Sequence, residues 1–185
     1  RPDSIIDDKN VYNVRKKIGS QLSKEFSIKA DLVVPVPDSG VPAAIGYSKQ
    51  AKIPFDLGII RNHYIGRTFI EPTSKIRHFG VKLKHNANEE LIKGKDIILI
   101  DDSIVRGTTS KKIVQMMKNC GARKVYMLIA SPQIFGSCFY GIDTPDSSDL
   151  ISNNMTIEEI EKFIMVDKLY HLSIDGLYQA IDSSP

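Results

Sequence analysis

The chain has 185 residues, of which 42% are hydrophobic and 25% are charged. This length and composition fit one globular domain with a sizeable apolar core, and they exclude an intrinsically disordered chain. The two cysteines, Cys120 and Cys138, stand in separate sequence contexts, which argues against a disulfide scaffold and favours a reducing, cytoplasmic compartment. We find no secretory signal, and polar residues interrupt the one long uncharged run, 125–142, so we predict no membrane association.

In chain order, the expected secondary structure alternates between helices and strands. Apolar residues at three- and four-residue steps from Val11 to Phe26 predict a helix over 10–26 with one buried face. Short runs of β-branched and other aliphatic residues predict strands. The strands are expected at 31–36, 55–60, 96–100 and 125–130, and the further helices at 42–50, from Gly107 to Gly121, at 156–164 behind a Thr156–Glu159 capping box, and from Asp175.

Strands that alternate with helices predict an α/β domain with a mainly parallel sheet, because parallel neighbours require crossover connections. In such sheets, ligands usually gather at the carboxyl ends of the strands. We therefore expect residues 1–185 to form one domain, with its ligand site at the turns that follow the strands.

The segment 61–85 carries most of the excess positive charge. The formal net charge of the whole chain is only +3, and the sole acid in this segment is Glu71. A localised cluster of cations suggests a small phosphorylated ligand more than a nucleic acid. The segment lacks periodicity and is long for a loop, yet it contains apolar residues, which favours a lid over a disordered tail. Its basic residues, some of them expected to be ordinary solvated charges, are Arg61, Arg67, Lys75, Arg77, Lys82 and Lys84.

The sequence IILIDDSIVRGTT, residues 97–109, places two aspartates directly after a predicted buried strand. Adjacent carboxylates repel one another and lose hydration on burial, so Asp101 and Asp102 require a cation, hydrogen-bond donors or open water. The hydroxyls and the glycine of 103–109 precede a helix N-terminus, which attracts phosphate. A ligand with phosphate and hydroxyl groups, or a divalent metal, reconciles both features. The alternative is that Asp101 or Ser103 caps a turn while the other carboxylate faces water.

A second turn, VPVPDSG at 34–40, follows an earlier predicted strand. Its prolines stiffen the chain, and Asp38, Ser39 and Gly40 permit a tight bend with exposed amides and a hydroxyl. Alone, this segment predicts only a plain turn. Together with the aspartate turn on a parallel sheet, it predicts a second phosphate site. The chain lacks the GxxxxGK[ST], GxGxxG, HExxH and CxxC patterns, which disfavours P-loop, Rossmann and zinc sites. A phospho-acceptor receiver domain, which also holds magnesium with acids at strand ends, is a weaker alternative because we find no lysine at the end of a predicted strand to complete its site.

These features resemble the type I phosphoribosyltransferases, whose signature is a hydrophobic strand, two acids and a Gly/Thr loop. Four segments, RPDS, RNHYIGRTFIEP, DDSIVRGTTS and CFYGIDTP, are together similar to the glutamine phosphoribosylpyrophosphate amidotransferase family. The similarity extends over nearly the whole chain, and Arg106 is typical of that family. It implies the type I phosphoribosyltransferase fold, a mainly parallel sheet flanked by helices, with a flexible lid loop at about 61–85.

The resemblance also implies roles toward phosphoribosylpyrophosphate (PRPP). Asp101 and Asp102 would hold the ribose hydroxyls and, together with Ser39, Mg2+. His63 departs from the arginine expected at its position. The pyrophosphate would be bound by Asp38, Ser39 and Gly40, the 5-phosphate by Ser103, Ile104, Val105, Arg106, Gly107, Thr108 and Thr109, and the catalytic lid residues would be Tyr64, Arg67, Lys82 and Lys84.

The implied reaction is attack of ammonia on C1 of PRPP with release of pyrophosphate, which gives 5-phosphoribosylamine in the first committed step of purine synthesis. The glutaminase half of the family uses an N-terminal cysteine nucleophile. This chain begins at Arg1, so ammonia and not glutamine is the expected donor. Some members place an iron–sulfur ligand where Cys138 stands, but one thiolate cannot hold a cluster, and none is expected.

The expected partners are PRPP and ammonia, with neither nucleic acid nor membrane, while a homo-oligomer or a separate glutaminase domain stays open. The alternatives are a non-catalytic PRPP-binding regulator, an inactive fragment, and a phosphoribosyltransferase for a base. The loop sequence YIGRTF favours the ammonia-using enzyme, because a regulator need not retain the lid and a base-specific enzyme requires a hood that stacks on the base.

Overall fold

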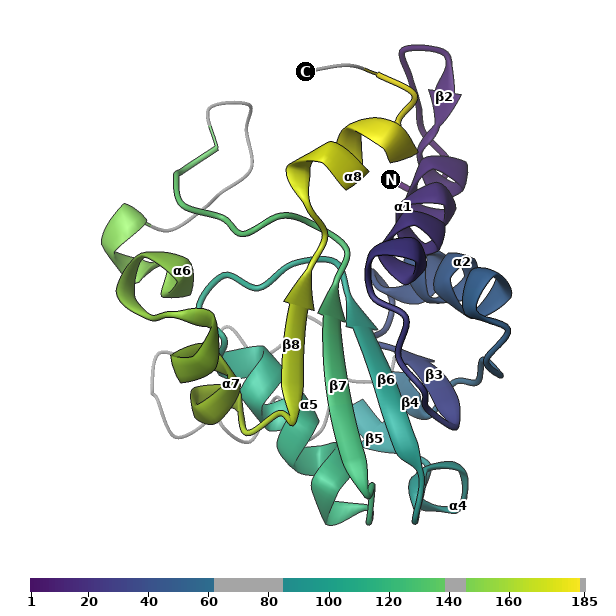
Figure 1. Cartoon of the computed structure of the whole chain (residues 1–185), viewed down its shortest axis with the longest axis vertical. Coiled ribbons are helices and arrows are strands. Elements are labelled where there is room, and N and C mark those ends of the chain that lie inside the picture. Colours follow the sequence, from purple (N-terminus) through teal and green to yellow (C-terminus); the bar gives the residue numbers. More distant parts are fainter. Residues whose placement is uncertain (62–84, 139–145, 184–185) are drawn as a thin grey trace, which may run out of the picture.

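The computed structural model describes residues 1–61, 85–138 and 146–183. At its centre, parallel strands pair in the order β3-β6-β7-β8 (Figure 1). The register places Pro35 beside Ile100, so β3 and β6 end side by side at one edge of the sheet. The strands are β3 (Leu32–Pro35), β6 (Asp96–Asp101), β7 (Lys124–Ile129) and β8 (Lys168–His171).

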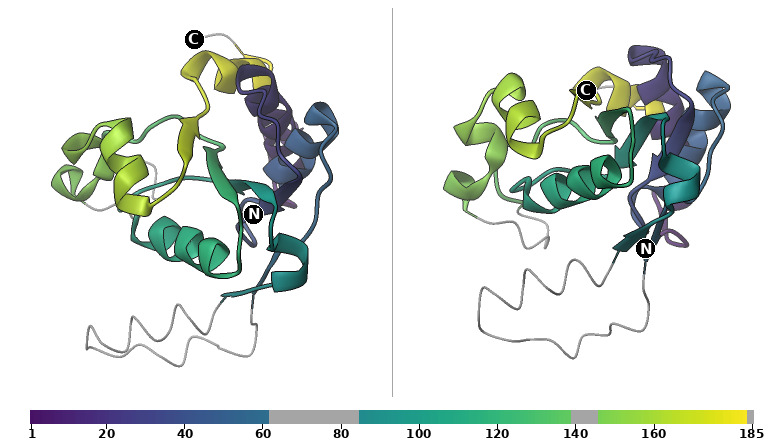
Figure 2. Two further views of the ribbon diagram at one scale, coloured as in Figure 1. Left: turned by 60° about the horizontal axis from the view of Figure 1, so that its bottom comes forward. Right: turned by 90° about the horizontal axis from the view of Figure 1, so that it is seen from below.

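Helices cover both faces of this sheet, as the turned views show (Figure 2). One face carries α1 (Val11–Glu25) and α2 (Val41–Ala51), with α8 (Ile174–Ala180) beside α1, and the other carries α5 (Thr108–Asn119) and α7 (Ile157–Ile164). Strand β6 is buried on both faces, which explains its unbroken aliphatic sequence. Alternate residues of β6 therefore enter the two apolar cores, Ile98 and Ile100 on the α1–α2 side and Ile97 and Leu99 on the α5–α7 side.

Helices α1 and α2 pack closely because each presents a glycine to the backbone of the other. A Cβ atom at Gly19 would lie 1.8 Å from the Ala43 carbonyl oxygen, and one at Gly46 would lie 1.9 Å from the Lys16 carbonyl oxygen. Residues with a side chain would force the helices apart. Since α2 begins directly after the turn at the end of β3, this helix pair fixes that turn against the sheet.

Most of the predicted elements are confirmed. The predictions at 10–26, 31–36, 42–50, 96–100 and 125–130 correspond to α1, β3, α2, β6 and β7, the helix after Gly107 is α5, and the Thr156–Glu159 capping box opens α7. The last helix begins at Ile174 behind a Ser173 cap, and not at Asp175. Strand β8 has no counterpart among the predicted strands.

The strand predicted at 55–60 is wrong in extent and position. The chain bonds to β3 only around Val33, through the Pro54 carbonyl and the Asp56 amide, and then leaves the central sheet. Only Ile59–Arg61 forms a strand, β4, which pairs antiparallel with β5 (His85–Ala87). The short remaining elements of the described ranges are β1 (Ile5–Ile6), β2 (Lys9–Asn10), α4 (Glu89–Ile92), the 3-10 helix η1 (Ser147–Asp149) and α6 (Ile151–Asn154).

Among the helices of the described residues, none is long and apolar enough to cross a bilayer.

Candidate functional site

The two turns that follow β3 and β6 contact one another. Ser39 Oγ donates a hydrogen bond to Asp101 Oδ1 at 3.4 Å, and the Val36 amide donates to the Ile100 carbonyl at 2.8 Å. The peptide bond between Pro37 and Asp38 is cis. The sheet therefore brings Ser39 and Asp101, two predicted site residues that are distant in sequence, within hydrogen-bond range.

Asp101 is the buried acid of this site, with 7% of its surface exposed. Burial, and then repulsion from Asp102, raise the pKa of Asp101 from 3.8 to about 7. Oδ1 accepts hydrogen bonds from the Asp102 amide and from Ser39 Oγ, which favour the charged carboxylate but do not offset the loss of hydration. Asp102 is exposed, so the adjacent acids occupy different environments. A cation at this position would relieve the cost of the buried charge.

Residues 103–109 connect β6 to α5 and divide into buried and exposed positions. Ile104 packs into the core below α5, so only its backbone can face a ligand. Gly107 is buried with a φ of +71°, a conformation that glycine adopts readily. Thr108 and Thr109 are exposed at the start of α5, whose Gly107 N-cap provides no side-chain cap. The first amides of α5 and both hydroxyls are thus placed to bind an anion.

Arg106 extends from this loop toward the helices that follow β7. Its Nη2 atom donates to Asp149 Oδ2 of η1 at 2.7 Å. Asp149 is not among the residues predicted for the site. Its sequence context, DTPDSSDL, has no spacing that links it to the loop, so only the tertiary structure reveals the pair.

Asp38 is exposed and forms an ion pair with Arg61 at the end of β4. Arg61 is the first basic residue of the segment 61–85, so this segment begins in contact with the turn after β3. The predicted catalytic residues Tyr64, Arg67, Lys82 and Lys84, together with His63, lie outside the described residues.

The predicted Mg2+ ligands, Ser39, Asp101 and Asp102, offer oxygen atoms, which suit a hard cation. In the described ranges, no group of three or more histidine, cysteine or acidic side chains could hold a metal ion. Magnesium bound through one or two carboxylates and the oxygens of a phosphorylated ligand needs no such group. The buried Asp101 carboxyl, with its raised pKa, fits this mode of binding.

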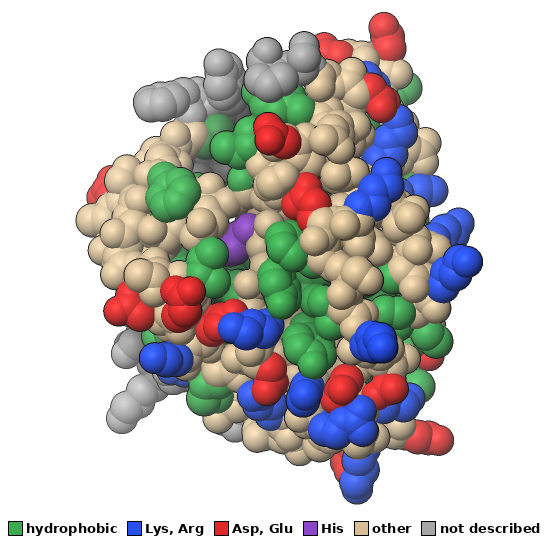
Figure 3. All heavy atoms as spheres, viewed as in Figure 1, with side chains coloured by type: hydrophobic (Ala, Val, Ile, Leu, Met, Phe, Trp, Pro, Cys, Tyr) green, Lys and Arg blue, Asp and Glu red, His purple; other side chains and the backbone are tan. Residues whose placement is uncertain are grey.

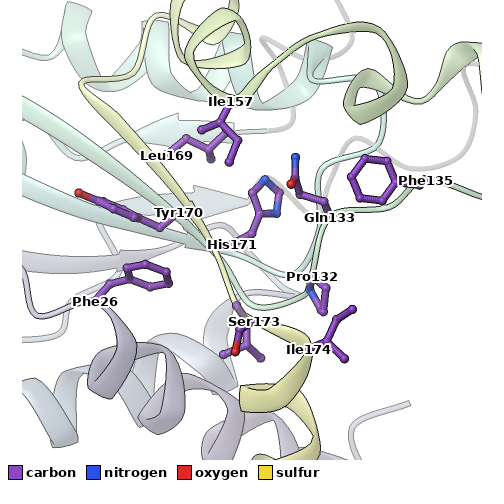
Figure 4. Close-up of a pocket in the computed structure, with 11 residues that line it drawn as sticks. Phe26, Pro132, Gln133, Phe135, Ile157, Leu169, Tyr170, His171, Ser173 and Ile174 are labelled. Carbon is purple, nitrogen blue, oxygen red and sulfur yellow. The ribbon is translucent and has the colours of Figure 1, made fainter. Parts of the chain in front are cut away.

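A separate hollow of about 380 Å³ lies beside β8, which β7 separates from β6. Figure 4 shows the His171 ring directed toward Gln133 in this hollow. The molecular face drawn in Figure 3 carries several exposed hydrophobic side chains and a histidine within a depression. Phe135 and Ile174, which also line the hollow, are 57% and 62% exposed. The hollow contains none of the predicted site residues.

The Cys120 side chain is a free thiol. Cys120 packs against the core, and burial raises the pKa of its thiol, as expected for a core residue. Cys138 is the last described residue before 139–145, which contains most of the CFYGIDTP segment. The expectation that the chain holds no iron–sulfur cluster therefore stays a prediction.

Residues 3–133 match the family model described as phosphoribosyl transferase domain. The chain belongs to the phosphoribosyl transferase domain family. Its parallel sheet with helices on both faces is the type I phosphoribosyltransferase fold, as the resemblance of its motifs implies.

Within this family, the chain is similar to amidophosphoribosyltransferases. It is 58% identical over 182 residues to the amidophosphoribosyltransferase of Rhizobium etli, and the match covers 98% of this chain and 37% of that protein. It is 53% identical to the chloroplastic amidophosphoribosyltransferase of Glycine max, with coverage of 95% and 31%. The solved structure of glutamine PRPP amidotransferase from B. subtilis, complexed with ADP and GMP, superimposes with a TM-score of 0.89 at 47% identity, with coverage of 98% and 40%. The chain therefore spans between 31% and 40% of the length of these relatives.

Proposed function

We propose that residues 1–185 form the phosphoribosyltransferase domain of an amidophosphoribosyltransferase, which transfers the nitrogen of ammonia to C1 of PRPP and releases pyrophosphate. The observation that carries this proposal is the contact between Ser39 and Asp101, which joins the turn after β3 to the aspartate turn after β6. Similarity to amidophosphoribosyltransferases over 98% of the chain supports the choice of reaction.

The two turns divide the substrate between them. Residues 38–40 would bind the pyrophosphate group, and residues 103–109 would bind the 5-phosphate through the first amides of α5 and the hydroxyls of Thr108 and Thr109. The exposed Asp102 and the buried Asp101 would accept hydrogen bonds from the ribose hydroxyls. This division fixes both ends of PRPP, and the ribose C1 atom lies between them.

Catalysis would consist of positioning and charge stabilisation, because the reaction requires no protein nucleophile. Mg2+, held by Ser39, Asp101 and Asp102, would supply positive charge to the leaving pyrophosphate. The amides of Asp38 and Ser39 would face the same developing charge, since the Gly40 amide already donates to the Val36 carbonyl. Tyr64, Arg67, Lys82 and Lys84 of the lid segment would close over it. Arg61, the first residue of this segment and a described one, contacts Asp38.

Two measurements test the proposal. The first is calorimetric titration with PRPP in the presence and absence of Mg2+. The second is pyrophosphate release with ammonium salt, with glutamine or with a purine base, using chain free of contaminating glutaminase. We expect magnesium-dependent binding, release with ammonia that increases with pH as more of it is unprotonated, and no release with glutamine.

The outcomes separate the alternatives. Pyrophosphate release that requires a base would reassign the enzyme to base transfer. Binding of PRPP without turnover would favour a regulator or an inactive fragment. Absence of PRPP binding by folded chain would contradict the proposed function.

A further inference from the structure

The loop 103–109 is fastened on one side to residues 147–155, which comprise η1 and α6. Arg106 pairs with Asp149 at 2.7 Å, and the Ile151 amide donates to the Val105 carbonyl at 2.8 Å. The Ile151 side chain also packs against Gly107, where a Cβ atom would lie 2.7 Å from Ile151 Cδ1. Three consecutive loop residues, 105–107, are therefore held by one short segment.

This segment is itself anchored. Asn153 Nδ2 donates to the Phe135 carbonyl at 3.0 Å and to the Ser147 carbonyl at 2.6 Å, which ties α6 to the loop after β7 and closes the turn of η1. Ile151 is buried, with 5% of its surface exposed. Asp149 thus presents its carboxylate to Arg106 from a backbone that also has anchors outside the loop 103–109.

The ion pair contributes little to folding, since the side chains of Arg106 and Asp149 are 57% and 52% exposed. Exposed pairs of this kind usually add little to the stability of a protein, because water and salt screen them. Their geometric effect is larger, because pairing selects one orientation of a long side chain and of the loop backbone that carries it. An unpaired Arg106 could turn back over the loop.

We infer that Asp149 is a positioning residue for the phosphate site: it holds Arg106 outside the loop 103–109, so that amides and threonine hydroxyls, and not the guanidinium group, form the surface that binds a phosphomonoester. This inference rests on the proposed function. A loop that is ordered before binding avoids the entropy cost of ordering on binding, so loss of the pair weakens affinity.

The test uses two probes, ribose 5-phosphate and PRPP with Mg2+, titrated into the parent chain and into Asp149→Asn, Asp149→Glu, Arg106→Ala and the double variant Arg106→Ala with Asp149→Asn. We expect Asp149→Asn and Arg106→Ala each to weaken ribose 5-phosphate binding about 3- to 10-fold. The double variant should be no weaker than the poorer single variant, because the two side chains act as one unit. Asp149→Glu, which retains the carboxylate, should recover most of the affinity.

A matched control removes another exposed ion pair that lies far from the loop. Asp182→Asn breaks the ion pair between Asp182 and Lys17 of α1. The side chain of Lys17 is 55% exposed and that of Asp182 is 61% exposed, so this pair matches the Arg106–Asp149 pair in exposure. The variant should leave the affinities for ribose 5-phosphate and for PRPP unchanged. Thermal unfolding of every variant should stay close to that of the parent, so that weaker binding reports the loop and not unfolding.

The change in ligand affinity caused by Asp149→Asn, weaker or tighter, tests the inference. If Arg106 were itself a phosphate ligand, freeing it would tighten binding while Arg106→Ala would weaken it, and that combination would overturn the inference. Equal affinity of parent and Asp149→Asn would also overturn it while leaving the proposed function intact. A folded parent that binds neither probe would contradict the proposed function and the inference together.

Discussion

Gly40 lies so close to Ile100 that a Cβ atom at Gly40 would stand 2.2 Å from the Ile100 carbonyl oxygen. The same carbonyl accepts a hydrogen bond from the Val36 amide, so the strand end of β6 is enclosed by the turn after β3. The contact between the two halves of the site therefore depends on the absence of a side chain at position 40.

Gly40→Ala should push the turn away from β6, because neither backbone can yield without breaking this contact. We expect a loss of about 1–3 kcal/mol in the free energy of unfolding, the usual range for overpacking, and weaker binding of PRPP with Mg2+. Urea denaturation and calorimetry measure the two effects. Gly136→Ala, at a position where a Cβ atom would meet nothing within 4 Å, is the control and should behave like the parent. Parent-like stability of Gly40→Ala would show that the turn can relax.

Asp101→Asn should stabilise the chain at alkaline pH while abolishing magnesium-dependent PRPP binding. The pKa of Asp101 is raised to about 7, so the carboxyl contributes stability below its ordinary pKa of 3.8, and this contribution is lost as pH rises through 7. Asparagine has no charge to bury, so at about pH 8 the variant should be more stable by about 0.5–2 kcal/mol, and the difference should vanish toward pH 4. Urea denaturation across this pH range measures the difference. A variant that is less stable than the parent at every pH would mean that the carboxylate is held by donors strong enough to offset its burial.

Ser39→Ala should raise the pKa of Asp101 further, because the Ser39 hydrogen bond favours the charged carboxylate. Magnesium-dependent binding of PRPP should then require a higher pH than in the parent. The carboxyl carbon shift of Asp101, followed by NMR during a pH titration, reports the change directly. Ser39→Thr keeps a hydroxyl and should restore the parent profile if the methyl group fits. An unchanged pKa in Ser39→Ala would remove the hydroxyl from the electrostatics of the site.

His171→Phe should make the chain less sensitive to acid. Burial lowers the pKa of His171 from 6.5, and the Ser131 backbone, which favours the protonated ring, offsets only part of this effect. The neutral ring therefore contributes stability above pH 6.5, and this contribution is lost as pH falls through the lowered pKa. Thermal unfolding at neutral and mildly acidic pH should show a smaller acid-induced drop for His171→Phe than for the parent. Tyr170→Phe, one residue earlier in β8, should retain the drop of the parent.

Periodicity predicted most of the fold because burial imposes it. Helix α1 has an apolar stripe because one of its faces is buried. Strand β6 has an unbroken aliphatic run because both of its faces are buried. Strand β8 escaped prediction because its four residues, KLYH, include a lysine and a histidine that give no alternation. The residues at 55–60 have strand propensity, but propensity does not determine which sheet a strand joins, and here the chain leaves β3 after Asp56.

The site was predictable where it follows the rule that parallel strands gather ligands at their carboxyl ends. That rule placed Ser39 near Asp101. It could not place Asp149 beside Arg106. Arg106 lies in the loop after β6 and Asp149 lies in η1, and no local sequence pattern links these two segments. The roles of Tyr64, Arg67, Lys82 and Lys84 rest on resemblance alone and stay predictions.

The strand order β3-β6-β7-β8 also determines when the site can exist during folding. Strands β6 and β7 and the intervening α5 are contiguous in sequence, so their pairing closes a shorter loop than that of β3 with β6, whose strands are separated by residues 36–95. The β6–α5–β7 unit is therefore expected to form early and to carry Asp101 and the loop 103–109 with it. Ser39 arrives only when β3 docks with α1 and α2. Until that late step, a folding chain has the loop 103–109 without its opposing turn, and the proposed ability to hold both ends of one ligand appears only when β3 has joined the sheet.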